Sequence, residues 1–576
     1  MRFIVTGVKI KLFLLLLYSM TTVAFADVSV SGLDSETQDN VQLMLSLSKE
    51  KCEAPAWKIR SLFAKADGEI DQALRALGYY HPVFEKTLTF KQDCWQAHFT
   101  VNLGPRVTVT DITIMLSGDA RNDPEFEKLR ATLLAEKGKP LRHDNYEKIK
   151  SRIESLALER GYLNSRFGTR QLLIDKANNS AHFKLAFDGG KRKRFGEVTV
   201  EQDILQPEFV AKLIAIKSDD FYASEQLAET HNTLSRSGYF DRVDIRPDTE
   251  NSGQRVPVTI HLSPQKKHHY SLGAGFDTDI GPLLSASYKN RYVNRRGHFL
   301  NANLDLAPVL SIADVEYSVP LANPVSDFFS VGGGFKREDT DTFNSLSAKL
   351  SARLKHVFTS GWRQTLFLDS VYEDFTVGSD SNQVLLLVPG GSWLRSVADS
   401  TLRPTRGHRL EFNLAGSYKN PLSDVSFAQG SAAAVWMQPL PWNGNFTGRI
   451  EQGVTLVDQF DLLPTSYRFY GGGMNSIRGY GYKELGPRDN LGNVVGGKFL
   501  SVVSAEYEQP VLDNWSVAAF IDSGNAYNLD NISVKTGVGL GLRWYSPIGP
   551  IRLDFALPLN DADSSFQIHF AAGARL

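Results

Sequence analysis

The last 309 residues of the chain, from His268 to Leu576, alternate polar and apolar side chains with a period of two. Residues 409–414 read Arg-Leu-Glu-Phe-Asn-Leu, and residues 301–306 read Asn-Ala-Asn-Leu-Asp-Leu. Successive side chains of a β-strand point to opposite faces, so this period gives each strand one apolar face and one polar face. The pattern predicts a long series of amphipathic strands in this half of the chain.

The same alternation fits two folds, a soluble β-sandwich and an outer-membrane barrel with a polar lumen. Turns marked at polar and Gly/Pro clusters divide the region into about 16 strands, an even number as such barrels require. We therefore expect a transmembrane β-barrel of 16 antiparallel strands. Aromatic residues at strand ends suit the interfacial girdles of a barrel, and examples are Tyr288, Tyr292, Trp362, Tyr418, Trp436 and Trp544.

Composition excludes two other classes. The mean hydropathy of −0.23 is too polar for a bundle of membrane helices, and after residue 26 no apolar run reaches the roughly 20 residues that a spanning helix needs. The net charge of −1 gives no electrostatic reason to bind nucleic acid.

The first 26 residues have the pattern of an export signal. Basic residues precede an apolar run over 12–20, and Ala24 and Ala26 occupy the two positions that a signal peptidase reads. The predicted signal peptide is 1–26, and the mature chain would begin at Asp27.

The chain has two cysteines, Cys52 and Cys94. Export to an oxidising compartment favours a disulfide between them, which would stabilise the fold by about 3–4 kcal/mol in the chain-entropy model. The alternative is a pair of buried free thiols. No CxxC motif or Cys/His spacing predicts a metal site.

Three segments before the barrel repeat one pattern, an amphipathic helix followed by Gly, Tyr and extended chain. The Gly-Tyr pairs begin at Gly78, Gly161 and Gly238, where a helix C-terminus favours a residue free to adopt positive φ. Each segment ends in an alternating strand, and these strands cover 99–103, 183–187 and 258–262.

The spacing of the pairs predicts three small α+β domains of about 80 residues, at 27–104, 105–190 and 191–265, before a barrel at 266–576. Exposed sheet edges in such domains suit pairing with an extended peptide. The alternative is that the domains are only spacers.

A basic run, Lys191-Arg192-Lys193-Arg194, lies beside Gly189-Gly190. We interpret it as a solvated hinge rather than a lipid or partner contact, because charges next to glycines need no ligand to explain them. No site is assigned to it.

One connection within the barrel is unusually long, from near Asp458 to near Lys498, which marks a functional or disordered loop. It contains a glycine run at 471–473 and the sequence Ile477-Arg478-Gly479-Tyr480. Glycines allow a tight backbone, and the Arg478 guanidinium can bind a carboxylate with two hydrogen bonds.

Two later strands offer carboxylates to this arginine, Glu506 and Asp522. Phe520, Asp522 and Gly524 share one face of a strand, so Asp522 can point inward with room beside Gly524. The hypothesis is a loop folded into the lumen and pinned by an ion pair. The alternative is an extracellular loop whose charges are unrelated.

These motifs together resemble one family. The signal peptide, the three repeats, Ile477–Tyr480, Phe520-x-Asp522-x-Gly524 and Ser546–Pro550 are similar to the outer-membrane assembly superfamily of POTRA-bearing 16-stranded barrels. Within it, three POTRA domains and the segment Gly275–Pro282 most resemble the outer-membrane subunits of translocation and assembly modules.

The resemblance implies an insertase in the outer membrane of a Gram-negative bacterium, with its POTRA domains in the periplasm. Its expected partners are unfolded β-barrel and autotransporter substrates, outer-membrane lipid and a TamB-like partner anchored in the inner membrane. No cofactor, metal or nucleic acid is expected.

The resemblance also implies site residues. Arg478 would contact Asp522 and Glu506, with Phe520 and Tyr480 packed nearby. The first and last barrel strands would pair weakly and form a lateral gate, which glycines in the first strand favour independently. The residues of this predicted gate are Tyr270, Leu272, Gly273, Gly275, Phe276, Phe566, Ile568 and Phe570.

Three other functions compete with this one. A two-partner secretion transporter would share the barrel but usually resembles a plug helix with two POTRA domains, and a passive porin would lack the repeats. An enzyme is disfavoured because HExxH, GxSxG and P-loop motifs are absent, and Gly537–Gly541 lies in a strand pattern. His268-His269 is expected to be a solvated pair rather than a metal site.

Overall fold

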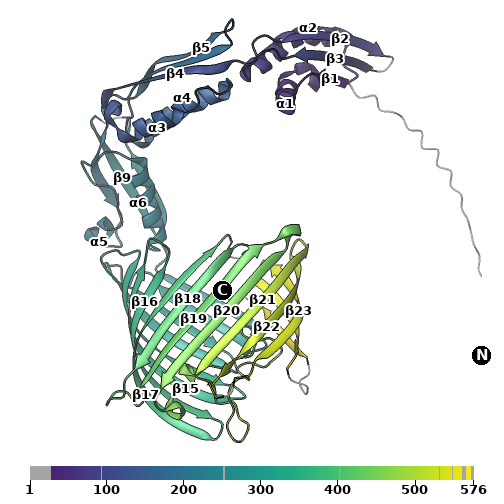
Figure 1. Ribbon diagram of the computed structural model, residues 1–576. Helices are drawn as coiled ribbons and strands as arrows, with labels where there is room; N and C mark the ends of the chain where they lie inside the picture. Colours follow the sequence, from purple (N-terminus) through teal and green to yellow (C-terminus); the bar gives the residue numbers. More distant parts are fainter. Residues whose placement is uncertain are drawn as a thin grey trace, which may run out of the picture. The chain divides into compact units, whose positions relative to one another are not determined.

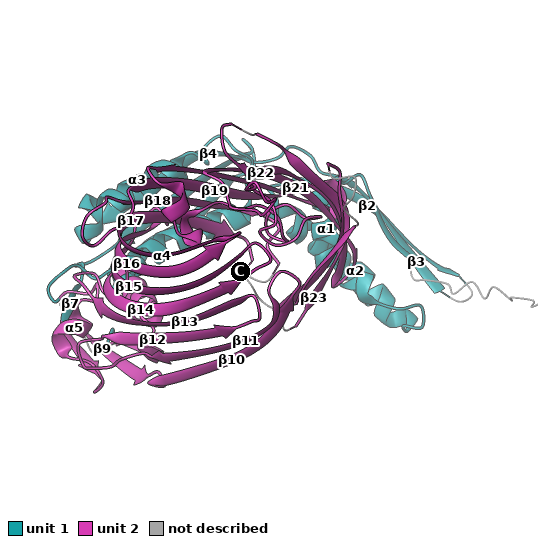
Figure 2. Cartoon of the chain, turned by 90° about the horizontal axis from the view of Figure 1, so that it is seen from below, with its two compact units in different colours: residues 1–196, 218–225, 248–257 teal, residues 197–217, 226–247, 258–576 magenta. Residues whose placement is uncertain are grey.

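The computed structural model describes residues 27–91, 94–250, 253–400, 403–530, 532–547, 549–560 and 566–572. The predicted signal peptide at 1–26, Ile548 and the final residues 573–576 lie outside the described residues. The chain divides into two compact units, coloured separately in Figure 2. The first unit comprises residues 1–196, 218–225 and 248–257, and the second comprises 197–217, 226–247 and 258–576.

Three small α+β modules precede the barrel, each with a three-stranded sheet (Figure 1). The sheets have the strand orders β1-β3-β2, β4-β6-β5 and β7-β9-β8. The elements of the first module are β1 (Asp27–Ser31), α1 (Ser35–Met44), α2 (Ala56–Ala76), β2 (Val83–Lys91) and β3 (Cys94–Asn102). Those of the second are β4 (Thr108–Ser117), α3 (Pro124–Leu134), α4 (His143–Glu159), β5 (Arg166–Asp175) and β6 (Ser180–Asp188). Those of the third are β7 (Arg194–Glu201), α5 (Pro207–Ala211), α6 (Ser224–Arg236), β8 (Phe240–Pro247) and β9 (Arg255–Pro264).

The Gly-Tyr pairs have the same local role in each module. Gly78, Gly161 and Gly238 have φ angles of 92°, 84° and 77°, a region that other residues avoid. Each glycine follows the end of a helix, so it reverses the chain toward the sheet. The tyrosine after it is buried in the second and third modules, where Tyr162 and Tyr239 are 1% and 2% exposed.

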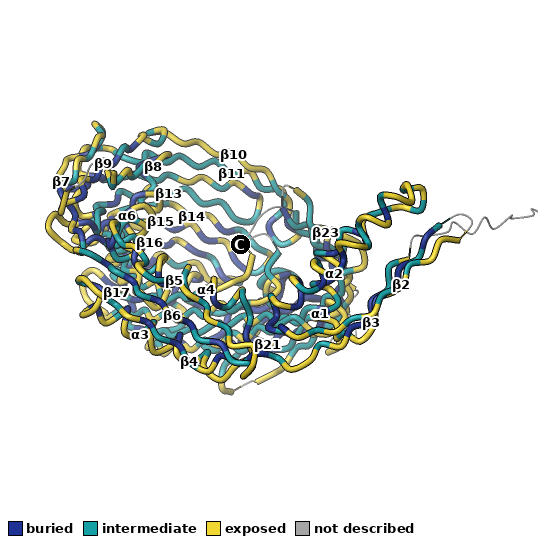
Figure 3. The backbone as a smooth tube through the Cα atoms, turned by 90° about the horizontal axis from the view of Figure 1, so that it is seen from above, coloured by how far each residue is buried: buried dark blue, intermediate teal, exposed yellow. Residues whose placement is uncertain are grey.

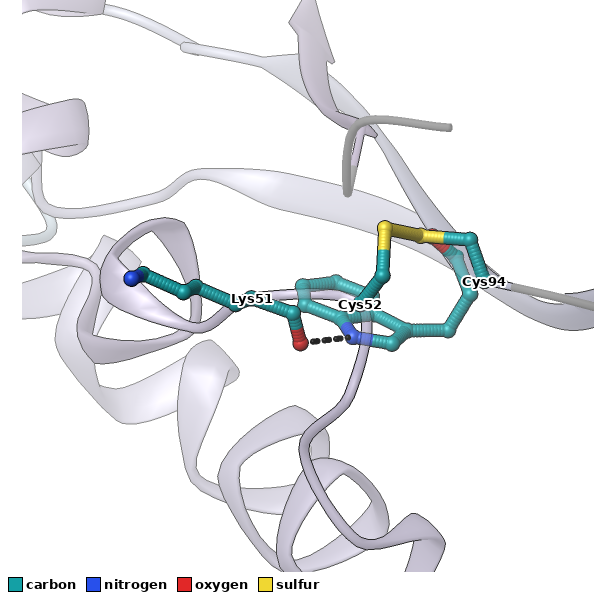
Figure 4. The surroundings of a disulfide bond; sticks show 4 residues. Lys51, Cys52 and Cys94 are labelled. Carbon is teal, nitrogen blue, oxygen red and sulfur yellow. Dashed lines mark hydrogen bonds between the residues drawn. A yellow bond between two sulfur atoms is a disulfide. The ribbon is translucent and has the colours of Figure 1, made fainter. Parts of the chain in front are cut away.

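Cys52 and Cys94 form a disulfide across 42 residues of sequence. Figure 4 shows that it joins the loop before α2 to the start of β3. The indole Nε1 of Trp95 donates a hydrogen bond of 3.1 Å to the carbonyl oxygen of Lys51 beside the disulfide. Covalent and hydrogen bonds therefore attach this loop to the sheet of the first module.

Replacing both cysteines with serine should lower the stability of the first module by about 4 kcal/mol, because the unfolded loop gains the entropy that the bond removes. The far-ultraviolet circular dichroism of the helices during urea unfolding would measure this, since the α-helices of the described residues lie in the modules. A reductant should reproduce the effect in the wild type and leave the double variant unchanged. Equal unfolding midpoints in the two proteins would contradict this role.

A buried carboxylate organises the second module. Asp123 is 5% exposed and caps α3 by accepting a hydrogen bond of 3.0 Å from the backbone nitrogen of Glu125. Arg160 Nε and the Tyr162 hydroxyl donate to its other oxygen at 2.8 and 2.9 Å. Burial alone would raise the pKa of Asp123, but the hydrogen bonds from Arg160, Glu125 and Tyr162 outweigh it and hold that pKa below its usual range.

This lowered pKa predicts acid sensitivity. The ionised form of Asp123 stabilises the fold at pH values above the ordinary aspartate pKa of about 4, and that contribution is lost as the pH falls through the folded-state value. An Asp123→Asn variant should therefore be less stable than wild type at neutral pH, and the difference should shrink below about pH 4. Urea unfolding at several pH values, followed by helix circular dichroism, would measure it. A difference that does not change with pH would contradict the prediction.

The prediction that Lys191–Arg194 is solvated is wrong for its two central residues, whereas Lys191 and Arg194 are exposed. Lys193 is only 4% exposed, and the Arg192 guanidinium lies 4.5 Å from the ring centre of Phe221. Arg192 Nε also donates a hydrogen bond of 2.7 Å to the carbonyl oxygen of Arg160. The run is ordered because its cations pack on an aromatic ring and satisfy a carbonyl group at the end of α4.

The second half of the chain is a closed barrel of 16 antiparallel strands, β10 to β25 (Figure 1), which confirms the predicted fold class. Neighbouring strands follow one another in sequence, and the barrel closes between β10 and β25. The strands are β10 (His268–Asp277), β11 (Gly281–Asn290), β12 (Phe299–Leu306), β13 (Leu310–Pro320), β14 (Asp327–Asp339), β15 (Phe343–Val357), β16 (Arg363–Val377), β17 (Asp380–Ala398), β18 (Gly407–Ser417), β19 (Phe427–Pro439), β20 (Asn445–Val457), β21 (Phe499–Leu512), β22 (Trp515–Tyr527), β23 (Lys535–Ser546), β24 (Gly549–Pro558) and β25 (Gln567–Ala572).

Along the barrel strands, apolar side chains are exposed and charged side chains are buried, which is the reverse of a soluble core. Phe412 and Leu414 are 45% and 57% exposed, whereas Asp369 and Glu373 are 7% and 0% exposed. Apolar side chains thus face outward and carboxylates face inward, which suits a wall against lipid and not a sandwich. Among the described residues, no helix is long and apolar enough to cross a bilayer.

His268 and His269 are both exposed, as the sequence analysis predicted, and His268 also contacts a neighbouring strand. Its Nδ1 lies 2.8 Å from the hydroxyl oxygen of Tyr288 on the neighbouring strand. The two rings also stack, with their centres 5.9 Å apart. This histidine therefore packs against the base of β11.

Candidate functional site

The long connection between β20 and β21 folds into the barrel lumen. It contacts inward-facing groups of strands from widely separated parts of the wall, including Glu338 on β14, Glu373 on β16 and Asp522 on β22. Its own Ile477 and Tyr480 are 0% and 3% exposed. We call residues 458–498 the lumenal loop.

Arg478 lies at the centre of the contacts between this loop and the wall. Its Nε and Nη2 donate to the two carboxylate oxygens of Asp522 at 2.7 and 3.0 Å, and its Nη1 donates to Glu506 at 2.6 Å. The guanidinium also lies 3.4 Å from the ring centre of Phe520. Arg478 is 6% exposed and Asp522 is 0% exposed, so the fork geometry is held away from water.

The sequence missed two members of this ion-pair network, Arg543 on β23 and Asp554 on β24. Asp554 accepts from Arg478 Nη1 at 3.1 Å and also from Arg543. Arg543 Nη2 donates in turn to Glu506 at 3.0 Å. Strand parity carried a signal for Asp554, since it lies between the outward-facing Leu553 and Phe555, but parity does not say which inward charge meets which.

Further contacts hold other parts of the lumenal loop. Lys483 Nζ lies 2.5 Å from Glu338 on β14, and Thr465 donates to Glu373 on β16 at 2.6 Å. Arg468, which is 8% exposed, donates to three backbone carbonyl groups of the loop itself. The loop is therefore attached to opposite parts of the barrel wall.

Glycines permit the close approach of the loop and the strands, although not in the way that the sequence indicated. A Cβ atom at Gly537 would collide with the carbonyl oxygen of Arg478, so that position on β23 must be bare. A Cβ atom at Gly524 would collide with the carbonyl oxygen of Ser501 on β21. Gly524 thus makes room for the neighbouring strand's backbone rather than for the Asp522 side chain. Gly479 has a φ of 95°, which lets the chain turn directly after Arg478.

The barrel closes through a seam between β10 and β25, where Phe276 pairs with Ala572 and Asp277 with Ala571. Residues 573–576 lie outside the described part of the chain. The backbone nitrogen of Thr278 also donates to the carbonyl oxygen of Phe570 at 2.9 Å. The seam is the one junction of the described barrel whose two strands are not consecutive in sequence.

The predicted gate residues fall into two groups at this seam. Phe276 and Phe570 pack across it with ring centres 5.9 Å apart. Tyr270, Leu272, Gly273 and Gly275 lie on β10 before its described pairs with β25, and Figure 3 colours most of this strand as exposed. Phe566 and Ile568, at the start of the last strand, are 55% and 45% exposed.

Replacing Arg478 with alanine should destabilise the barrel by about 3–5 kcal/mol, because it leaves the buried Asp522 carboxylate without its guanidinium partner. Arg478→Lys should recover only part of this, since an ammonium group lacks the planar fork. Heating samples to increasing temperatures before a detergent gel would measure the effect. The folded barrel migrates faster than the unfolded chain, and the temperature at which this faster band disappears should fall in the variant.

Arg409→Ala is the matched control. Arg409 also bonds to a glutamate on the inner face, Glu411, at 2.8 Å, but its side chain is 49% exposed, and such pairs contribute about 1 kcal/mol or less. Equal losses of stability in the Arg478→Ala and Arg409→Ala variants would show that the buried ion pairs of Arg478 contribute no more than an exposed pair.

Comparisons with known proteins agree with this geometry. Residues 329–576 match the Omp85 superfamily domain, residues 27–103 match a family described as POTRA domain TamA domain 1, and residues 193–265 match one described as surface antigen variable number repeat. The fold resembles a crystal structure of BamA from Haemophilus ducreyi lacking POTRA domains 1–3, with a TM-score of 0.68, 16% identity and coverage of 81% of this chain and 99% of that one.

Two curated relatives are named outer membrane protein assembly factor BamA. The protein from Nitratidesulfovibrio vulgaris is 24% identical over 375 residues, which cover 61% of this chain and 47% of the relative. The one from Neisseria meningitidis serogroup B is 24% identical over 520 residues, which cover 77% of this chain and 64% of the relative. The chain thus spans about half to two thirds of the length of these relatives.

The fold and the lumenal loop define a class, a membrane β-barrel that carries small periplasmic modules and holds its own loop in its lumen. Within that class, the barrel at 329–576 matches the Omp85 superfamily domain, and the modules at 27–103 and 193–265 match POTRA families. The barrel lies in the outer membrane of a Gram-negative cell, with the POTRA domains in the periplasm.

Proposed function

We propose that this protein inserts other β-barrel proteins, autotransporters among them, into the outer membrane through a lateral gate between β10 and β25. The observation that carries the proposal is that β10 and β25 are neighbours in the wall but lie at opposite ends of the barrel sequence, so no hairpin connection holds this junction closed. The match of residues 329–576 to the Omp85 superfamily domain supports it.

The mechanism needs no covalent chemistry. A strand edge within a bilayer is costly because its amide and carbonyl groups find no water to bond to. Opening the seam exposes such edges on β10 and β25, and an unfolded substrate strand that pairs with either edge is stabilised there. The substrate can then grow strand by strand while its own backbone groups stay paired.

We further propose that the protein is TamA, the outer-membrane subunit of a translocation and assembly module, acting with a TamB-like partner anchored in the inner membrane. Two observations support this narrower identity, the match of residues 27–103 to the first POTRA domain of TamA and the presence of three modules before the barrel. The names of the curated relatives support an assembly factor in the broader sense.

The alternative is a two-partner secretion transporter, which would pass one polypeptide through the lumen. The structure gives less support to that route, because the lumenal loop is bonded to wall strands on opposite sides. The turn between β17 and β18 adds a second obstruction. Its Arg403 donates to the carbonyl oxygen of Asp513 at 3.1 Å and lies 4.4 Å from the ring centre of Tyr545.

A disulfide across the seam should abolish insertion without unfolding the barrel. Phe276→Cys and Ala572→Cys replace register partners on β10 and β25, so oxidation should lock the gate. We expect at least a tenfold loss in the rate at which protein in lipid vesicles inserts an autotransporter barrel, and full recovery on reduction. Protease protection of the folded substrate would measure the rate.

The control is a second locked pair, Leu410→Cys with Ala434→Cys, which are register partners on β18 and β19. This junction stays closed in the proposed mechanism, so its disulfide should leave insertion unchanged. Normal insertion by the seam-locked protein would refute the lateral gate. Photocrosslinking from β10 in cells would then separate the two functions, since many different barrel proteins indicate an insertase and one exported protein indicates a secretion transporter.

A further inference from the structure

The lumenal loop contacts both strands of the seam, and not only the wall opposite them. On the β10 side, the backbone nitrogen of Met474 donates a hydrogen bond of 2.8 Å to Oδ2 of Asp279, two residues after the end of β10. Asp279 is itself fixed, because its backbone nitrogen donates to the Asp277 carboxylate at 2.8 Å. One end of the loop's tip is thus bonded to the first strand's turn.

On the β25 side, the backbone nitrogen of Gly479 donates a hydrogen bond of 3.0 Å to Nε2 of His569. His569 is 3% exposed, so this bond is made away from water. An accepting Nε2 places the ring proton on Nδ1, and Nδ1 lies 3.7 Å from Oδ1 of Asp279. His569 therefore faces the loop with Nε2 and faces Asp279, in the turn after β10, with Nδ1.

The loop is shaped to reach these two groups. A Cβ atom on Gly473 would lie 2.8 Å from Oδ2 of Asp279, so a side chain there would compete with the Met474 hydrogen bond. Gly479, whose nitrogen binds His569, directly follows Arg478, and Arg478 is held by Asp522 on β22. Arg478 and its ion pairs therefore fix the tip of the loop at the point where the tip bonds to the seam.

We propose that Asp279 and His569 are positioning residues that latch the seam to the lumenal loop. With the loop held by Arg478, β10 cannot leave β25 without breaking the contacts of Asp279 with Met474 and His569. The seam lacks the direct chain connection that joins the other neighbouring strands, and this latch adds a side-chain closure to its backbone pairing. The inference rests on the proposed function of the seam as a gate, and it assigns that gate's resting closure to two side chains and the loop.

The latch residue His569 also lies beside the ion-pair network of Arg478. His569 on β25 is the register partner of Asp554 on β24, and Asp554 accepts from Arg478. A movement of Arg478 would therefore disturb the neighbour of His569 as well as the adjacent Gly479. Loosening the loop, by a substrate or by mutation, should release the seam.

Hydrogen–deuterium exchange of the full chain in lipid nanodiscs, without substrate, tests the latch. His569→Leu and Asp279→Asn should each speed amide exchange at the seam, in peptides covering 274–280 and 567–572, by about tenfold, equivalent to about 1.4 kcal/mol. His569→Gln should remain closer to wild type, because its side-chain oxygen can accept from Gly479. Gly473→Ala should speed exchange on the β10 side.

His356→Leu is the matched control, because Nδ1 of His356 on β15 also lies against an aspartate, at 2.5 Å from Oδ1 of Asp327, but far from the seam in strand order. It should leave seam exchange unchanged. Seam exchange at the wild-type rate in His569→Leu, or equal acceleration in every strand, would overturn the latch. Folded migration on an unheated gel confirms that each variant is a closed barrel. Because no substrate is present, the exchange measurement does not depend on the insertion assay. Normal insertion by the seam-locked protein would refute the gate, but the latch could still be measured by exchange.

Discussion

The structure depends on one constraint, that backbone groups inside a bilayer must bond to one another because lipid offers them no partner. A closed sheet satisfies this requirement for every strand, including the two strands where the ends of the barrel sequence meet. Every other junction of the described barrel joins strands that are consecutive in sequence, whereas β10 and β25 are held together without a direct connection. In the proposed mechanism, that junction is where a substrate strand would find an edge.

The polar lumen is the second consequence of the same architecture. Outward apolar faces force the charged faces of the strands inward, where their charges need partners as water is displaced by the loop. Arg478 and Arg543 share the carboxylates of Asp522, Glu506 and Asp554 in one network. This network fixes the loop, and the loop in turn contacts Asp279 and His569 at the seam. The interior charges and the seam are thus parts of one connected arrangement.

Much of this fold could be predicted from residue order. The period of two gave the 16 strands, and the spacing of the Gly-Tyr pairs indicated three modules. Arg478 stood out because it lies in a glycine-rich loop, and Asp522 because strand parity turned it inward. The solvated run at Lys191–Arg194 was wrong at Arg192 because local charge does not reveal Phe221, which follows 29 residues later and packs against Arg192.

The sequence alone determined that the second half forms strands with one apolar and one polar face, since its period of two continues over about 300 residues, and the count of about 16 strands favoured a barrel. It also singled out Arg478 as a candidate anchor for the loop. Only the tertiary structure decided which inward charges meet, that Gly524 admits a neighbouring backbone, and that Asp279 and His569 face each other across the seam. These facts depend on strand register and barrel closure, which bring together residues almost 300 positions apart.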